Sequence, residues 1–204
     1  MPEDVVSRHP IVPMNPEEQT YIKRILRGET ELYGYFLDTY GPRILTLVQQ
    51  IVSNREDAED LTQDIFVKAF ESLKSFRGDC QFITWIYRIA YNMTNSALRK
   101  SKQRQEFLPA NENMPDAADT DDAFDFADET ERDERIEDLQ LALSWLTAEE
   151  RALITLFYYD NKSIEDCAYI TGLSEANIKV RLHRIRKKLS SYIYRIKYGN
   201  RPLS

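Results

Sequence analysis

An acidic segment that interrupts the helical pattern of this chain limits its possible folds more than any other feature. Residues 106–138 hold 14 acidic residues against two arginines, which gives this segment a formal charge of −12. It also contains two prolines, and such a composition buries too little apolar surface to form a packed domain. The sequence therefore predicts an acidic linker at residues 103–135 between two small domains, at residues 17–102 and 136–197.

Both ends of the chain are predicted to lie outside these domains. Four of the eight prolines fall within the first 16 residues, so residues 1–16 are expected to form a flexible N-terminal extension and residues 198–204 a short tail. The N-terminus has no apolar run followed by a small-residue cleavage site, and no segment reaches the roughly 20 apolar residues of a membrane span. The sequence therefore predicts a cytoplasmic protein.

The apolar residues of both predicted domains recur three and four positions apart, which is the spacing of one face of an α-helix. The clearest run is Ile178, Leu182, Ile185, Leu189, Ile193 and Ile196. In the N-terminal domain we expect a helix to begin at Pro42, because proline suits the first helical position. Two more helices are predicted at about residues 55–74 and 82–100. No segment of useful length alternates apolar and polar residues, so the predicted fold class is all-α.

Residues 164–181 carry the pattern of a helix-turn-helix, in which two short helices meet at a tight turn. Ser163 and Ser174 are placed to cap the two helices, and Gly172 supplies the positive φ of the turn without a Cβ penalty. Three more residues suit close packing of the two helices: Ala168, Leu173 and Ile178. Residues 147–150 match a capping box, so another helix is expected to begin there. The second domain is thus predicted to be a helix-turn-helix domain.

The second helix of this motif carries charges suited to DNA. Residues 161–204 contain ten basic residues against three acidic ones. The start of the helix would present Ser174, Glu175 and Asn177 to base edges in the major groove. Later basic residues would bind phosphates without reading the base sequence: Lys179, Arg181, Arg184 and Lys187. The alternative, a solvated basic face on an ordinary amphipathic helix, is disfavoured by the adjoining turn pattern.

A second candidate DNA interface lies in residues 76–100, where aromatic and basic residues are interleaved and Asp79 is the sole acidic residue. Unstacked bases can stack on aromatic rings while cations follow the phosphates, so this composition suits single-stranded or melting DNA. The basic candidates are Arg77, Arg88, Arg99 and Lys100. The alternative is that the aromatic residues, including Trp85, form the hydrophobic core.

An acidic cluster occupies the predicted helix that begins near residue 55; it comprises Asp57, Glu59, Asp60 and Asp64, with Gln63 among them. An enzyme would use such carboxylates as metal ligands or as an acid–base pair. However, no glycine-rich loop accompanies them, and the two cysteines and two histidines of the chain are scattered. We therefore expect no metal, cofactor, small-molecule substrate or catalytic activity. The cluster is interpreted as a solvated face or as a surface for a partner protein.

Three segments together resemble the extracytoplasmic-function (ECF) group of bacterial RNA polymerase sigma factors. They are DAEDLTQDIFVKAFESLKSF at residues 57–76, FITWIYRIAYN at 82–92 and SIEDCAYITGLSEANIKVRLHRIRKKL at 163–189. They occur in the order typical of the family, and the resemblance covers residues 20–102 and 138–195. It implies a sigma region 2-like helical bundle and a region 4-like helix-turn-helix domain. Such a protein would bind core RNA polymerase and promoter DNA and promote strand opening.

The resemblance also implies roles for individual positions. The acidic helix would dock on the clamp helices of the polymerase through Asp57, Asp60, Gln63, Asp64 and Phe66. The segment 77–92 would capture a flipped base of the minus-ten promoter element, with Phe82, Trp85, Arg88 and Asn92 at the positions that melt and read DNA. The helix-turn-helix would read the minus-thirty-five element, and the helix at 148–159 would border the polymerase flap. The acidic linker would lie toward the active-site cleft, and an anti-sigma factor is implied as a further partner.

Cys167 departs from the family pattern, because a branched aliphatic residue is usual at its position. Two other interpretations remain open at this stage. A stand-alone helix-turn-helix regulator with an N-terminal sensor domain would bind duplex DNA unaided and would give the acidic cluster no partner. A protein-interaction module, such as an anti-sigma-binding decoy, would occupy the polymerase without starting transcription.

Overall fold

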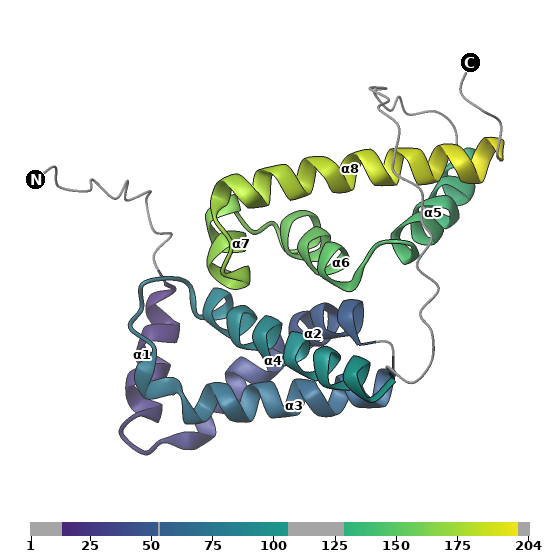
Figure 1. Cartoon of the computed structure of the whole chain (residues 1–204). Coiled ribbons are helices and arrows are strands. Elements are labelled where there is room, and N and C mark those ends of the chain that lie inside the picture. The colour runs from purple at the N-terminus through teal and green to yellow at the C-terminus, as the bar shows by residue number, and fades with distance from the viewer. Residues whose placement is uncertain (1–13, 53, 106–128, 200–204) are drawn as a thin grey trace, which may run out of the picture. The chain divides into compact units, whose positions relative to one another are not determined.

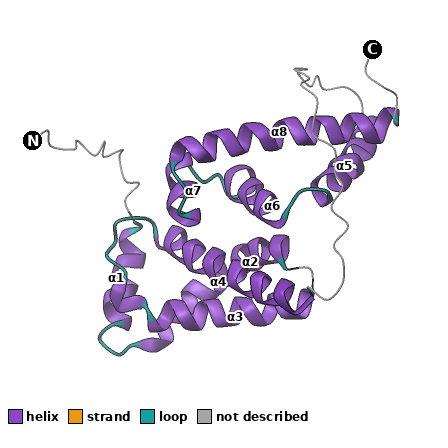
Figure 2. Cartoon of the chain, viewed as in Figure 1, coloured by secondary structure: helices purple, strands orange, loops and turns teal. Residues whose placement is uncertain are grey.

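A computed structural model of the chain describes residues 14–52, 54–105 and 129–199 (Figure 1). Every regular element in these described residues is helical, as Figure 2 shows, which confirms the all-α prediction. The chain divides into two compact units, Met1–Leu98 and Arg99–Ser204, and the division falls within the fourth long helix. None of the helices in the described part of the chain combines the length and the apolar content needed to span a membrane.

The N-terminal unit is a bundle of four α-helices with two short 3₁₀ turns. These are α1 (Pro16–Ile25), η1 (Thr30–Tyr33), α2 (Gly34–Ile51), α3 (Arg55–Glu71), η2 (Leu73–Ser75) and α4 (Phe82–Gln105). Helices α2 and α3 pack against each other, and α4 joins them through the rings of Phe36 and Phe82, whose centroids lie 4.3 Å apart. The core is built from fully buried side chains that share one face of each helix: Phe36, Ile44, Leu47, Ile65, Phe82 and Ile86.

Helix α2 runs without a break through Pro42, so the prediction that a helix begins at this proline is wrong. The apolar stripe of the helix continues on both sides of it, with Tyr40 and Ile44 both buried. Proline lacks an N–H group, which leaves the carbonyl four residues earlier, at Asp38, without its helical donor. Asp38 and Pro42 are both exposed, so water can satisfy that carbonyl and the packing of the stripe outweighs the local cost.

The N-terminal unit begins earlier than the predicted boundary at residue 17. Met14 is buried, and the side chain of Asn15 caps α1 by accepting a hydrogen bond of 3.0 Å from the amide of Glu17. Pro16 occupies the first turn of α1, where its missing N–H has no helical partner to lose. The predicted N-terminal extension is thus shortened by these residues, and residues 1–13 lie outside the described residues.

The predicted linker is likewise shorter than expected, because helices extend into both of its ends. Helix α4 continues to Gln105, and the first helix of the second unit begins at Glu129. The remaining linker, residues 106–128, lies outside the described residues, as does most of the predicted C-terminal tail.

The C-terminal unit contains four α-helices and one π-helical turn. They are α5 (Glu129–Ser144), α6 (Ala148–Ile154), η3 (Thr155–Tyr159), α7 (Ile164–Thr171) and α8 (Glu175–Tyr198). Helix α8 packs against α5, α6 and α7. The core residues of the C-terminal unit are almost completely buried: Ala142, Leu156, Cys167, Ile170, Ile178 and Ile185. Cys167 is completely buried, so its small side chain packs at the position where a branched aliphatic residue is usual.

The predicted caps and turn of this unit are confirmed. Thr147 and Glu150 form a capping box at the start of α6, and Ser163 and Ser174 cap α7 and α8 by accepting hydrogen bonds from backbone amides. Gly172, between α7 and α8, has a φ of 75°. These short-range contacts set the angle at which α8 leaves α7 and therefore decide which face of α8 remains exposed.

Candidate nucleic-acid and protein interfaces

Helix α8 has one buried face, and this fixes the direction of every other side chain on the helix. Ile178, Leu182 and Ile185 are at most 3% exposed and hold α8 against the rest of its unit. Successive residues of an α-helix turn by about 100°. The opposite face is therefore centred on residues two positions from a buried one. It carries Ala176, Val180, His183, Arg184 and Lys187.

The predicted DNA contacts of α8 differ in direction, although Arg184 and Lys187 line a hollow beside α6 together with Asn177 and Arg181. Lys179 and Arg184 are exposed, and Lys187 is half-buried on the outward side of the helix. Glu175 is also exposed at the start of the helix, whereas the hydroxyl of neighbouring Ser174 accepts the 3.3 Å capping hydrogen bond from the amide of Asn177. The outward face of α8 thus carries the cations Arg184 and Lys187, Lys179 lies on a flank, and no acidic residue follows Glu175 in the helix.

Arg181 and Asn177, which the sequence predicts as DNA contacts, are joined to α6 by a chain of polar contacts. Arg181 Nε donates a hydrogen bond of 3.0 Å to Asn177 Oδ1, and Arg181 Nη1 lies 3.3 Å from Glu149 Oε2. Both residues lie on the flank of α8 between its buried and outward faces. Their side chains therefore connect α8 to α6 in this structure.

A second link between these helices uses Lys188 and Glu150. Lys188 Nζ lies 2.7 Å from Glu150 Oε1, and the other carboxylate oxygen of Glu150 accepts a 2.9 Å hydrogen bond from the amide of Thr147. Burial alone would raise the pKa of Glu150, but the hydrogen bonds from Lys188 and from Thr147 outweigh burial and lower this pKa below its usual value. The ionised carboxylate thus caps α6 and anchors α8 at once.

Helix α4 presents a second candidate DNA surface. Four of its predicted contacts share one stripe because they are spaced three, four and seven residues apart: Trp85, Arg88, Asn92 and Arg99. Trp85 is half-buried, and the other three are exposed. Arg77, in the loop before α4, and Lys100, about a quarter-turn from the stripe, are exposed as well. The stripe therefore combines one aromatic ring with two cations and an amide.

Trp85 is held by an aromatic cluster beneath it. Its ring centroid lies 5.2 Å from that of Phe76 and 5.6 Å from that of Phe82. Phe82 itself is completely buried between Phe36, Phe76 and Trp85. The structure therefore places Phe82 in the core, while Trp85 combines packing with an accessible face. The alternative that the aromatic residues form the core thus applies to Phe82, and the DNA contact of Trp85 stays a prediction.

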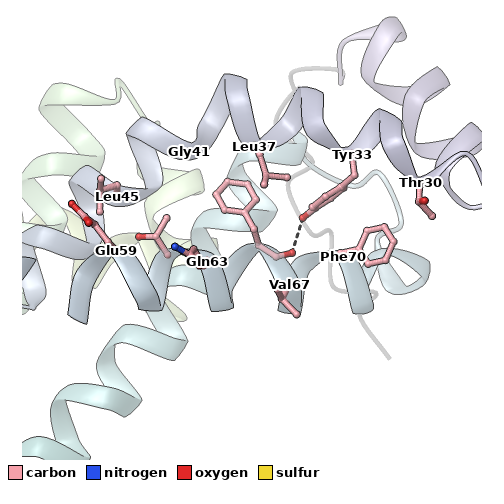
Figure 3. Close-up of a pocket in the computed structure, with 11 residues that line it drawn as sticks. Thr30, Tyr33, Leu37, Gly41, Leu45, Glu59, Gln63, Val67 and Phe70 are labelled. Carbon is pink, nitrogen blue, oxygen red and sulfur yellow. Dashed lines mark hydrogen bonds between the residues drawn. The ribbon is translucent and has the colours of Figure 1, made fainter. Parts of the chain in front are cut away.

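An apolar groove of about 780 Å³ lies between α2 with its preceding turn and α3 (Figure 3). Its apolar lining residues come from both sides: Tyr33, Leu37 and Leu45 from η1 and α2, and Phe66, Val67 and Phe70 from α3. Tyr33 closes one wall, because its hydroxyl donates a 2.8 Å hydrogen bond to the carbonyl of Phe66. Val67 is 58% exposed, which is unusual for a branched aliphatic side chain at a packed helix pair.

Acidic residues of α3 border this groove. Glu59 and Gln63 line the groove, and Asp60 and Asp64 are exposed on the adjoining side of α3. Phe66, the remaining predicted contact near the groove, is buried and forms part of its floor. Asp57 is exposed near the start of α3 and takes no part in the lining. The sequence missed Leu37, Val67 and Phe70, because the groove arises only when α2 and α3 pack together.

These features define a two-unit helical DNA-binding protein with a helix-turn-helix domain, and comparison with known proteins gives its family. Residues 36–104 match the family model of sigma-70 region 2, and residues 136–189 match that of sigma-70 region 4. The first segment covers nearly all of α2 to α4, and the second runs from the middle of α5 to the middle of α8. They therefore include the predicted DNA contacts on α4 and α8 and most of the groove lining.

Curated relatives cover nearly the whole chain. The RNA polymerase sigma-H factor of Pseudomonas aeruginosa is 27% identical over 85% of this chain and 92% of its own length. The ECF sigma factor SigW of Bacillus subtilis is 28% identical over 82% of this chain and 92% of its own length. A solved structure of sigma factor RpoE with the anti-sigma factor NepR, from Bartonella quintana, is similar with a TM-score of 0.59 and 26% identity, over 83% of this chain and 98% of that chain.

The chain therefore belongs to the ECF group of the sigma-70 family of RNA polymerase sigma factors. It is a transcription initiation factor that binds core RNA polymerase and promoter DNA. Because the N-terminal unit matches sigma-70 region 2 rather than a sensor domain, the interpretation as a stand-alone regulator is set aside.

Proposed function

We propose that the groove between α2 and α3, with its acidic border, is the surface through which this sigma factor binds core RNA polymerase. The observation that carries the proposal is the exposed apolar lining of the groove, above all Val67 and Phe70 on α3. Exposed apolar patches bordered by polar residues are typical of protein-binding sites. Asp60, Gln63 and Asp64 would give the contact its orientation, because charged groups at the rim of an interface steer association.

The stripe on α4 is proposed to engage the minus-ten element during strand opening. A base that leaves the stack could lie against the accessible face of Trp85, while Arg88 and Arg99 hold the neighbouring phosphates and Asn92 offers hydrogen bonds to the base. Arg77 and Lys100 would add to the attraction for the backbone. For Phe82 we propose a packing role, because its ring is fully buried beneath Trp85.

The outward face of α8 is proposed to lie in the major groove at the minus-thirty-five element. Lys179, Arg184 and Lys187 would hold phosphates, and Glu175 would lie near the base edges at the start of the helix. Arg181 and Asn177 would instead keep α8 at its angle to α6 through Glu149. Because core RNA polymerase works in the bacterial cytoplasm, we propose that location for this chain. An anti-sigma factor is proposed as a regulatory partner, since the similar structure of RpoE was solved with one.

Substitution of Val67 tests the polymerase-binding groove. Val67→Glu places a charge among apolar groove residues, and burying that charge against a partner is costly. We expect the variant to bind core RNA polymerase at least about tenfold more weakly than the wild type, measured by co-elution on gel filtration and by a fluorescence titration. Because Val67 is exposed in the free chain, circular dichroism should show an unchanged fold.

The matched control is Gln49→Glu, which makes the same product residue at an exposed position of α2 outside the groove. This variant should bind core RNA polymerase like the wild type. If Val67→Glu bound as tightly as Gln49→Glu, the groove would not be the docking surface.

The double variant Asp60→Ala with Asp64→Ala should bind core RNA polymerase more weakly than the wild type. This loss of affinity should be larger at low salt than at high salt, because salt screens the charges at the rim of an interface.

A further inference from the structure

Val180 is the one large apolar side chain that α8 exposes in its N-terminal half. The exposed large apolar residues of this helix are Val180, Tyr194 and Tyr198, and the two tyrosines lie near its C-terminal end. Val180 is 47% exposed and follows the fully buried Ile178 by two residues, so it lies about 200° around the helix, on the opposite side. Its isopropyl group thus points away from the core at the centre of the proposed DNA-reading face.

The fold gives no reason for a valine at this position. A β-branched residue lowers helix propensity, and an exposed one gains little from burial. Its neighbours on the outward face are Ala176 one turn earlier and His183 and Arg184 one turn later, all exposed. Within this set, Ala176 and Val180 form a short apolar line that offers methyl groups and no hydrogen-bonding group.

We infer that Val180 reads the C5-methyl group of a thymine in the minus-thirty-five element. In the major groove, thymine is the base that presents a methyl group, whereas cytosine presents an amino donor at the neighbouring position. An isopropyl group can bury that methyl but cannot accept a hydrogen bond from the cytosine amino group, which would lose its water without compensation. Val180 therefore favours thymine over cytosine, because burying the thymine methyl group is favourable and desolvating the cytosine amino group is costly. The inference rests on the proposed role of α8.

The test removes the methyl group from the DNA rather than from the protein alone. Holoenzyme made from this chain and bacterial core RNA polymerase first selects its preferred duplexes from a library randomised across both promoter elements. Each thymine of the selected upstream element is then replaced by deoxyuridine, which lacks the C5-methyl group and keeps every hydrogen-bonding atom. Equilibrium binding is measured for wild-type and Val180→Ala holoenzymes on each duplex.

We expect one thymine whose replacement by deoxyuridine weakens wild-type binding about three- to tenfold, as loss of a buried methyl contact implies. The same replacement should leave the Val180→Ala holoenzyme within about twofold of its affinity for the thymine duplex, because the contact is already missing. If no single deoxyuridine replacement distinguishes the two proteins, the methyl contact does not exist.

Lys187→Ala separates failure of this inference from failure of the proposed role of α8. If α8 lies on the DNA, Lys187→Ala weakens binding to the thymine and deoxyuridine duplexes equally, because a phosphate contact carries no base information. If Lys187→Ala weakens binding to both duplexes equally and no deoxyuridine replacement distinguishes Val180→Ala from the wild type, the inference about Val180 is wrong and the role of α8 stands. No effect of Lys187→Ala on any duplex would overturn the role of α8 as well.

Discussion

Gly172 makes the sharp angle between α7 and α8 possible at the level of a single residue. Its φ of 75° lies in the left-handed region, where a Cβ atom meets the following carbonyl oxygen. No heavy atom beyond its chain neighbours lies within 4 Å of the position that a Cβ would take, so backbone strain alone opposes a larger residue. Backbone strain is therefore the physical reason why this turn favours glycine.

Gly172→Ala should lower the free energy of unfolding of the C-terminal unit by about 1–2 kcal/mol, the cost of the left-handed conformation for a residue with a Cβ. Urea denaturation followed by the fluorescence of Trp145, in a Trp85→Phe background, measures this value. Gly172→Asn is the matched control and should recover part of the loss, because asparagine tolerates the left-handed region. Equal stability of Gly172→Ala and the starting protein would show that the turn can change its conformation.

Cys167 illustrates how burial controls the chemistry of one side chain. Burial raises the pKa of its thiol to about 12, and the nearby carboxylate of Asp166 acts in the same direction. Because the folded-state pKa lies above that of an unfolded thiol, the protonated thiol favours folding below about pH 9. This contribution is lost as the pH rises toward 12.

We expect iodoacetamide at pH 8 to modify Cys80, which is partly exposed, and to leave Cys167 unmodified in the folded protein. Mass spectrometry of peptides from the native and the urea-unfolded protein checks this expectation, and unfolding should make both thiols reactive. Rapid modification of native Cys167 would mean that the C-terminal core opens far more often than its packing implies.

Residues whose role depends on their immediate neighbours could be predicted from the sequence. Thr147, Ser163 and Ser174 act within three residues of themselves, so short-range chemistry identifies them as caps. The burial of Phe66 and Phe82 could not be predicted in this way, because it depends on contacts with helices elsewhere in the chain. The aromatic content of α4 alone does not say which ring faces the core.

At the scale of the element, α8 has three functional sides set by its helical period. The buried side holds the unit together, the flank with Asn177 and Arg181 connects to α6, and the outward side carries Val180 and Lys187. The sequence predicted the basic character of this helix and placed Arg181 among its DNA contacts, which stays a prediction. Its pairing with Glu149, 32 positions earlier in the chain, becomes visible only in three dimensions.

This division predicts different salt dependences for variants of α8. Arg184→Ala and Lys187→Ala should each reduce the slope of log binding constant against log salt concentration by about one, because each would remove one phosphate contact. Arg181→Ala should change the slope less, since its guanidinium is engaged by Glu149 and Asn177. Filter binding of holoenzyme to promoter duplex at several salt concentrations measures the slopes. A reduction for Arg181→Ala as large as that for Lys187→Ala would place Arg181 on the DNA.

Helix α2 shows the limit of local patterns at this scale. The proline rule favours a helix start at Pro42, but the apolar stripe from Phe36 to Ile51 requires one continuous helix. Tertiary packing therefore overrides the local preference, as it also does at the groove, whose lining combines residues from α2 and α3. Neither outcome follows from the order of residues along one segment.

At the scale of the whole molecule, we propose that polymerase binding and DNA binding use different surfaces of the chain. In this proposal the groove and the acidic border of α3 bind the polymerase, while the cations of α4 and α8 bind DNA. The formal net charge of −7 hides this division, because the acidic residues concentrate in residues 106–138 and the basic ones in residues 161–204. The distribution of charge, rather than its sum, indicated the function.

In vitro transcription tests this account most directly. Bacterial core RNA polymerase is incubated with fragmented genomic DNA, with nucleotides and with wild-type chain, Val67→Glu or no addition, and the 5′ ends of the transcripts are sequenced. We expect the wild-type chain to produce defined start points preceded by two shared sequence elements, and Val67→Glu to produce none above core polymerase alone. If the wild-type chain bound core polymerase yet left the start points unchanged from core polymerase alone, it would occupy the enzyme without initiating, and the central claim would be contradicted.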